Sequence, residues 1–142
     1  MRTLIRPALF ALWSTALVAS VSNLIVLFAG QAANGASVFV DLQGMTLDVD
    51  PVTVIFATIA GALMAAVGSL IAMRLLARRG PLVIIIAGSV LALLSLFGTS
   101  AATTTTGVVT LAIMHLVTGT VVVVGNVVIH SRAKDRAAVS TR

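Results

Sequence analysis

Long apolar runs separated by short polar connections dominate the chain. A helix needs about 20 consecutive apolar residues to cross a bilayer, and four stretches reach or approach that length. They cover residues 8–30, 52–79, 81–98 and 107–130, and the second of them ends in basic residues. The pattern predicts one transmembrane domain over residues 1–142, with a cytoplasmic tail at residues 131–142.

Each run is expected to be helical, even where β-branched residues are dense. Val121 to Val124 would favour a strand in water. In lipid a lone strand leaves its backbone groups unpaired, whereas a helix satisfies them internally, and four segments cannot close a barrel. Gly80 and Pro81 fit the end of one helix and the start of the next. The expected fold is an all-α membrane protein, an up-down bundle of four transmembrane helices.

The composition identifies lipid as the main solvent of the chain. Hydrophobic residues make up 59% and charged residues 9% of the sequence, and the mean hydropathy of +1.16 is far above that of a soluble domain. Cysteine is absent, which excludes disulfides, thiolate metal ligands and cysteine nucleophiles. The sequence has no GxSxG, HExxH, phosphate-loop or dinucleotide motif. We therefore expect no catalytic residue, no metal and no cofactor.

The basic residues predict the orientation of the helices. All nine flank the first helix, the connection between the second and third, or the end of the fourth: Arg2, Arg6, Arg74, Arg78, Arg79, Arg132, Lys134, Arg136 and Arg142. The connections at residues 31–51 and 99–106 contain none. Because Lys and Arg collect on the cytoplasmic side, we expect a multi-pass plasma-membrane protein with both termini cytoplasmic. This arrangement explains the net charge of +5 without a nucleic-acid partner.

The first run has an alternative interpretation as a cleaved secretory signal. Arg2 and Arg6 precede it, and small residues follow it in the sequence GQAANGAS. However, its apolar part is longer than the roughly 7 to 15 residues of a signal core, and it contains Asn23. We expect it to be retained as a transmembrane helix.

Several polar side chains are expected at membrane depth. Helical spacing places Asn23, Thr58 and His115 at similar depth in the outer leaflet, with Asn126 on the same stripe of the fourth helix as His115. One interpretation is a small binding cavity or proton site with the histidine as a switch. The other is hydrogen bonding between helices, which fixes their register. We expect Asn23 and His115 to lie within hydrogen-bond reach, directly or through one water.

Small residues recur every four positions in the second helix, at Ala57, Gly61, Ala65 and Ser69. Such a stripe lets another helix backbone approach closely. The partner is either a helix of the same chain, which we favour, or a second copy of the protein. In the first case Gly61→Leu should force two helices of the chain apart.

The connection at residues 31–51 resembles a short hairpin. Apolar residues alternate around a turn at Gly44, namely Val38, Val40, Leu47 and Val49. The same segment contains three carboxylates, Asp41, Asp48 and Asp50. Carboxylates suit Ca²⁺ or Mg²⁺, but their spacing matches no ion-binding loop. We interpret them as solvated charges that keep the segment outside the membrane.

Short motifs connect the chain to a known group of proteins. They are Arg6-Pro7 ahead of a helix that contains Asn23, the sequence RRGP at residues 78–81, and MHLVTG at residues 114–119. With these motifs nearly the whole chain resembles a family of small four-helix membrane proteins of unknown function found in actinobacteria. The resemblance implies four helices and no particular activity, since none is established for that family.

These features leave functions of different classes open. We expect a non-catalytic structural or accessory subunit in the lipid bilayer, as a homo-oligomer or beside a larger membrane complex. The alternative is a small oligomeric transporter or permeation unit that uses the polar layer around His115, and an enzyme acting on lipid ranks third. A transporter needs a hydrated path to Asn23 and His115, whereas an accessory protein should keep them dry and bonded.

Overall fold

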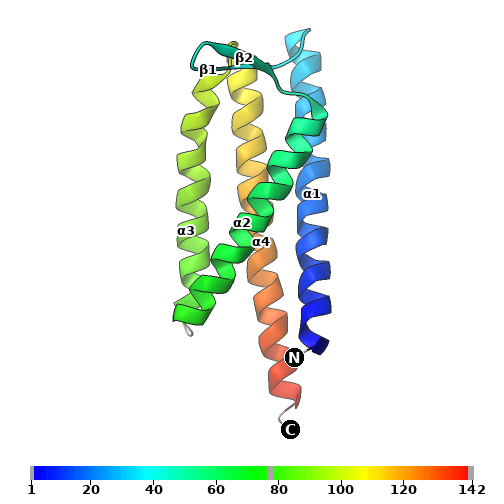
Figure 1. The fold of residues 1–142 in the computed structure, drawn as a ribbon, viewed down its shortest axis with the longest axis vertical. Coiled ribbons are helices and arrows are strands. Elements are labelled where there is room, and N and C mark those ends of the chain that lie inside the picture. The colour runs from blue at the N-terminus through cyan, green and yellow to red at the C-terminus, as the bar shows by residue number, and fades with distance from the viewer. Residues whose placement is uncertain (1, 77–78, 141–142) are drawn as a thin grey trace.

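The computed structural model describes residues 2–76 and 79–140 and is dominated by helices (Figure 1). In chain order its elements are α1 (Arg2–Asn34), β1 (Phe39–Leu42), β2 (Met45–Asp48), α2 (Pro51–Leu76), α3 (Gly80–Ser95), the 3-10 helix η2 (Leu96–Ala101) and α4 (Thr105–Ser140). Four described segments are long and apolar enough to cross a membrane: Leu12–Asn34, Pro51–Ala72, Leu82–Ala101 and Thr105–Val128. The prediction of four such helices is confirmed.

The helices at the two ends of the chain are longer than their apolar runs. α1 begins at Arg2, and α4 continues to Ser140 through the segment that we expected to be a tail. Arginine, lysine and alanine have high helix propensity and make up most of residues 132–138, so hydropathy alone underestimates the length of α4. The predicted basic end of the second helix includes residues 77–78, which lie outside the described residues, as does Arg142.

β1 and β2 form an antiparallel hairpin at the end of the molecule opposite the start of α1 (Figure 1). Gln43 and Gly44 form its turn with φ values of 57° and 86°. Positive φ at both positions is what a two-residue turn needs if it is to match the twist of the strands. The backbone N–H of Gly44 donates to Asp41 Oδ1 at 2.7 Å. The hairpin is joined to the connection before α4, because the N–H of Thr103 donates to the carbonyl of Phe39 at 3.0 Å.

An apolar core lies directly beneath the hairpin. It combines residues from α1, α2, α4 and both flanks of the hairpin: Leu27, Val38, Val49, Val54, Leu111 and Met114. Leu27 and Val38 are fully buried. The hairpin is therefore fixed to α1, α2 and α4 by its own flanking residues.

α1 and α3 both pack closely on α4, and glycines of α4 set the approach. A Cβ added at Gly119 would lie 2.6 Å from Cβ of Ala92 in α3, and one added at Gly125 would lie 2.6 Å from Oγ1 of Thr15 in α1. Both distances are shorter than van der Waals contact allows. The missing side chains let two neighbouring backbones approach α4.

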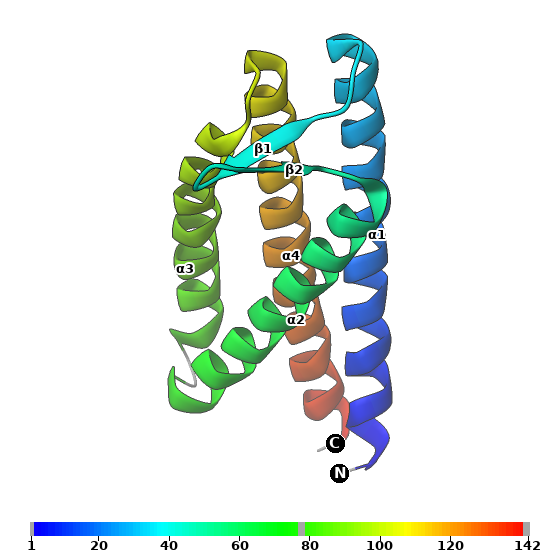
Figure 2. The same cartoon turned by 45° about the horizontal axis from the view of Figure 1, so that its top comes forward.

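α2 follows a diagonal path across this group of helices. The N–H of Val49 donates to the carbonyl of Val38 at 2.9 Å, so the hairpin returns the chain to the side of α1 before α2 begins. From there α2 crosses α4 and ends beside the start of α3 (Figures 1 and 2). α2 and α3 consequently diverge toward the hairpin end.

α2 starts from a capping aspartate. Oδ1 of Asp50 accepts the N–H of Thr53 at 2.8 Å, and Oδ2 accepts the Thr53 hydroxyl at 3.1 Å. The hydrogen bonds from the backbone and then the side chain of Thr53 hold the pKa of the Asp50 carboxyl below its usual value. Asp50 therefore has a structural role at the start of α2, where the sequence indicated only a solvated loop charge.

Candidate functional site: a groove between α2, α3 and α4

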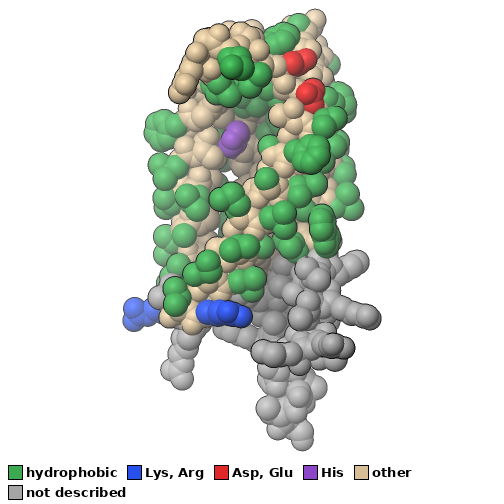
Figure 3. All heavy atoms as spheres, in the orientation of Figure 1, with side chains coloured by type: hydrophobic (Ala, Val, Ile, Leu, Met, Phe, Trp, Pro, Cys, Tyr) green, Lys and Arg blue, Asp and Glu red, His purple; other side chains and the backbone are tan. Residues whose placement is uncertain are grey.

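The divergence of α2 and α3 leaves a groove of about 650 Å³ with α4 as its back wall. On α4 the lining extends from Leu111 to Asn126, which is about 22 Å at the helical rise per residue. Figure 3 shows the hollow, with a histidine side chain in it near the hairpin end, and His115 belongs to the lining. A mostly apolar groove of this size is typical of sites that hold small molecules.

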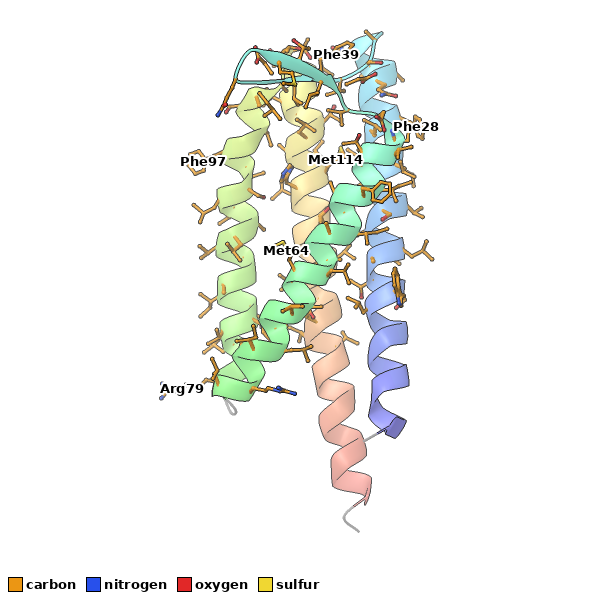
Figure 4. The ribbon with its side chains drawn as sticks, in the orientation of Figure 1. Phe28, Phe39, Met64, Arg79, Phe97 and Met114 are labelled. Atoms are coloured by element: carbon orange, nitrogen blue, oxygen red, sulfur yellow. The ribbon has the colours of Figure 1, made fainter. Side chains whose placement is uncertain are left out.

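The walls of the groove are built largely from small and apolar side chains. Met64 of α2 and Met114 of α4, both labelled in Figure 4, belong to its lining. All four residues of the predicted helix-packing stripe also line it: Ala57, Gly61, Ala65 and Ser69.

The expected packing of this stripe against another helix of the chain is wrong at Gly61. A Cβ added at Gly61 would meet no atom of the described residues within 4 Å. The diagonal path of α2 carries Gly61 away from α3, so this residue faces the groove. Ala65, one turn later, does pack against a core cluster that includes Ala16 of α1 and Val122 of α4. Contact with a second copy of the protein stays a prediction.

A buried polar cluster joins three helices at the edge of the groove. Nδ2 of Asn23 donates to Oγ1 of Thr58 at 2.9 Å and to Oγ1 of Thr118 at 2.7 Å. Asn23 is 3% exposed and Thr58 5%. These bonds place Asn23 of α1 and Thr58 of α2 at one depth, as helical counting indicates. Thr118 lies three positions after His115 and therefore on the same stripe of α4, but it does not belong to the predicted layer.

His115 lies one turn before Thr118 and lines the groove. Its Nδ1 is 2.8 Å from the carbonyl oxygen of Leu111, and because a carbonyl only accepts, Nδ1 carries the hydrogen. The expected direct contact between Asn23 and His115 does not form. Thr118 stands on the same face of α4 and takes the amide hydrogen instead, while His115 bonds within its own helix.

Asn126 is separated from the polar cluster. It lines the far end of the groove, and its Nδ2 donates to the carbonyl of Val122 at 2.9 Å. It lies eight positions after Thr118, which is about 12 Å along α4. The predicted four-residue layer therefore divides into a cluster of Asn23, Thr58 and Thr118 with His115 beside it, and a separate Asn126.

Within the described part of the chain, two buried oxygens have no hydrogen-bond partner, Oγ of Ser20 and Oδ1 of Asn23. Of these two residues, Asn23 lines the groove. The groove lining, taken over the same described residues, contains no Lys, Arg, Asp or Glu. The side-chain groups available to a bound molecule are therefore the amide oxygens of Asn23 and Asn126, hydroxyls and an imidazole, which act by hydrogen bonding.

Comparison with known proteins places the chain in a family. Over residues 4–132 it matches the family of unknown function DUF6069. No curated protein and no solved structure matches the chain. The matched range includes all four candidate spans and every residue of the groove. Because the match covers far more than half of its length, the chain belongs to the DUF6069 family of unknown function.

Proposed function

We propose that this protein is a non-catalytic accessory protein of the plasma membrane that holds a lipid-soluble molecule in the groove between α2, α3 and α4. One observation carries the proposal, namely about 650 Å³ of space lined mainly by apolar and small side chains in a chain with four candidate spans. Such a groove, once in a bilayer, offers apolar contact to any molecule that enters from the lipid.

The proposed orientation is an up-down bundle with the hairpin outside and both termini in the cytoplasm. Charge supports it, since acidic side chains lie at the hairpin end and the exposed Arg74 and Arg79 lie at the opposite end (Figure 3). Arginine flanks favour the cytoplasmic side. The wide end of the groove then lies in the outer leaflet.

The polar cluster supports an accessory role over transport. Asn23 donates directly to both Thr58 and Thr118, which is the arrangement expected where polar groups hold helices together. The transporter alternative rests on His115, which lines the groove. It needs water to reach the imidazole from both sides of the membrane. Catalysis is not proposed, since the described residues of the lining include no paired acid and base.

Lipid retention tests the proposal. We expect native mass spectrometry of the protein, released gently from membranes, to show a bound lipid that Gly61→Leu removes, because the new side chain enters the open groove. Ala60→Leu is the matched control, since Ala60 is exposed and lies next to Gly61 but outside the groove lining.

Two results would contradict the proposal. One is a bound lipid that both variants retain equally. The other is a dimer that Gly61→Leu alone dissociates, because the occupant of the groove would then be a second copy of the chain.

A further inference from the structure

We infer that the wide end of the groove is a binding site for the hydroxyl group of a neutral lipid alcohol, with Asn23 and His115 as its hydrogen-bond acceptors. The inference rests on the proposed function and names the chemical class of the bound molecule. It is carried by two residues of the groove lining, Asn23 and His115, each of which has an acceptor atom that the described chain leaves without a donor.

The first acceptor is Oδ1 of Asn23. This side chain is 3% exposed, and its two amide hydrogens are used by Thr58 and Thr118. Oδ1 itself has no partner within residues 2–76 and 79–140. Buried amide oxygens are nearly always hydrogen-bonded. A donor from outside the chain would complete this group.

The second acceptor is Nε2 of His115. Nδ1 holds its hydrogen toward the Leu111 carbonyl, which leaves Nε2 as the ring nitrogen that can accept a hydrogen bond. The described groove lining contains no carboxylate that would pair with a charged imidazole. Thr118, which bonds Asn23, lies one turn from His115 on α4. The two acceptors therefore belong to the same end of the groove.

The lining favours a neutral hydroxyl over a charged head group. Among described residues it has no Lys or Arg for a phosphate and no Asp or Glu for an ammonium. His115 also lies ten positions after the start of α4, roughly 15 Å along the helix, where an ionic group is costly to bury. A hydroxyl can donate to Asn23 or His115 and accept from the hydroxyl hydrogen of Thr118.

The rest of the groove fits the hydrocarbon part of such a molecule. It continues along α4 for about 22 Å between apolar walls that include Met64, Leu91 and Val123. A long-chain alcohol would place its hydroxyl near the hairpin end and its chain toward the junction of α2 and α3.

Photoaffinity labelling tests the inference. The probe is a long-chain alcohol with a diazirine in its chain, added to the full-length protein in phosphatidylcholine vesicles. Its methyl ether, which keeps the chain but lacks the donor, is the matched control. We expect the alcohol to label peptides of the groove about three- to ten-fold more strongly than the ether, the ratio expected for one neutral hydrogen bond.

Variants of His115 test its role as an acceptor. His115→Leu should lower alcohol labelling by about two-fold or more without changing ether labelling, whereas His115→Gln, which keeps an acceptor, should retain most of it. His115 bonds only within its own helix among described residues, so both variants should fold. Gly61→Leu should block both probes and Ala60→Leu neither.

The outcomes separate this inference from the proposed function. Equal labelling by alcohol and ether, both blocked by Gly61→Leu, would overturn the hydroxyl site and leave the groove as a lipid site. Labelling that Gly61→Leu does not reduce would overturn both. Preference for the alcohol that survives His115→Leu would overturn the assignment of His115 as an acceptor.

Discussion

At the scale of single residues, position along a helix predicts depth but not hydrogen-bond partners. Counting from the helix ends puts Asn23 and Thr58 at one level, and they bond at 2.9 Å. The same counting cannot choose between His115 and Thr118, which are one turn apart on one face of α4. The choice depends on the rotation and tilt of the helices. Those are set by packing against neighbours.

Removing Asn23 should destabilise the protein. Asn23→Ala deletes the donor to Thr58 and Thr118, and hydrogen bonds between membrane helices contribute about 0.6 to 2 kcal/mol each. We expect a loss of roughly 1 to 3 kcal/mol in the free energy of unfolding, measured by SDS titration in mixed micelles.

Thr118→Val provides the control for this prediction, because it removes one of the two acceptors and nearly keeps the side-chain shape. In the double variant the two losses should not add, since one of the bonds is shared. Additive losses would show that Asn23 and Thr118 do not interact.

The capping aspartate predicts a dependence of stability on pH. Its folded-state pKa is lowered, so ionised Asp50 stabilises the fold above the pKa of the unfolded carboxyl. This contribution is lost as the pH falls through the lower, folded-state value. Thermal unfolding in detergent should therefore show the parent losing stability relative to Asp50→Asn between neutral pH and pH values below about 3.9.

Asp50→Asn keeps an acceptor for the N–H of Thr53, and Asp41 and Asp48 are common to both proteins, so the comparison isolates one carboxyl. If the difference in unfolding temperature between the two proteins is the same at neutral and acidic pH, the capping interaction does not control the stability of α2.

At the scale of helices and strands, the sequence predicts which segments are helical better than which of their faces meet. Four apolar runs indicate four spans, and Gly44 falls in the observed turn. Small residues, however, look alike in a sequence wherever they lie. Gly61 faces the groove, while Gly119 and Gly125 meet other helices, because the hairpin directs α2 along a diagonal that no helical periodicity encodes.

The glycines of α2 and α4 should therefore respond differently to substitution. Gly119→Ala adds a methyl group 2.6 Å from Cβ of Ala92, which cannot move without its backbone, and overpacking of this kind costs about 1 to 3 kcal/mol. Gly61→Ala adds the same group to open space. SDS titration should show clear destabilisation for Gly119→Ala and little or none for Gly61→Ala. The reverse order would mean that Gly61 of α2 is packed against a helix.

At the scale of the whole molecule, charge and hydropathy predict how the chain enters a membrane. They cannot predict the groove, because that space results from the angle between α2 and its neighbours rather than from any one segment. The resemblance to a four-helix family of unknown function identified the class of protein and nothing about its groove. The family match indicates no activity either, because the family is one of unknown function.

The proposed orientation can be tested with single cysteines, since the chain has none of its own. In intact cells a membrane-impermeant maleimide should label Gln43→Cys, at the tip of the hairpin, and should label Arg79→Cys only after permeabilisation. The basic flanks give the physical reason. Labelling of Arg79→Cys in intact cells would contradict the proposed orientation, because it would place the connection between α2 and α3 outside the cell.

The central claim is that the groove is open to lipid, and contacts between alanine methyl groups and lipid chains test it most directly. The test uses methyl-labelled protein in nanodiscs and nuclear Overhauser effects to acyl-chain protons. The account predicts strong effects at the groove alanines Ala57 and Ala87, as at the exposed Ala60, and none at the buried Ala16 and Ala19. If Ala57 and Ala87 instead show as little contact with acyl-chain protons as Ala16, the result would contradict the claim, because the groove would then be closed by protein.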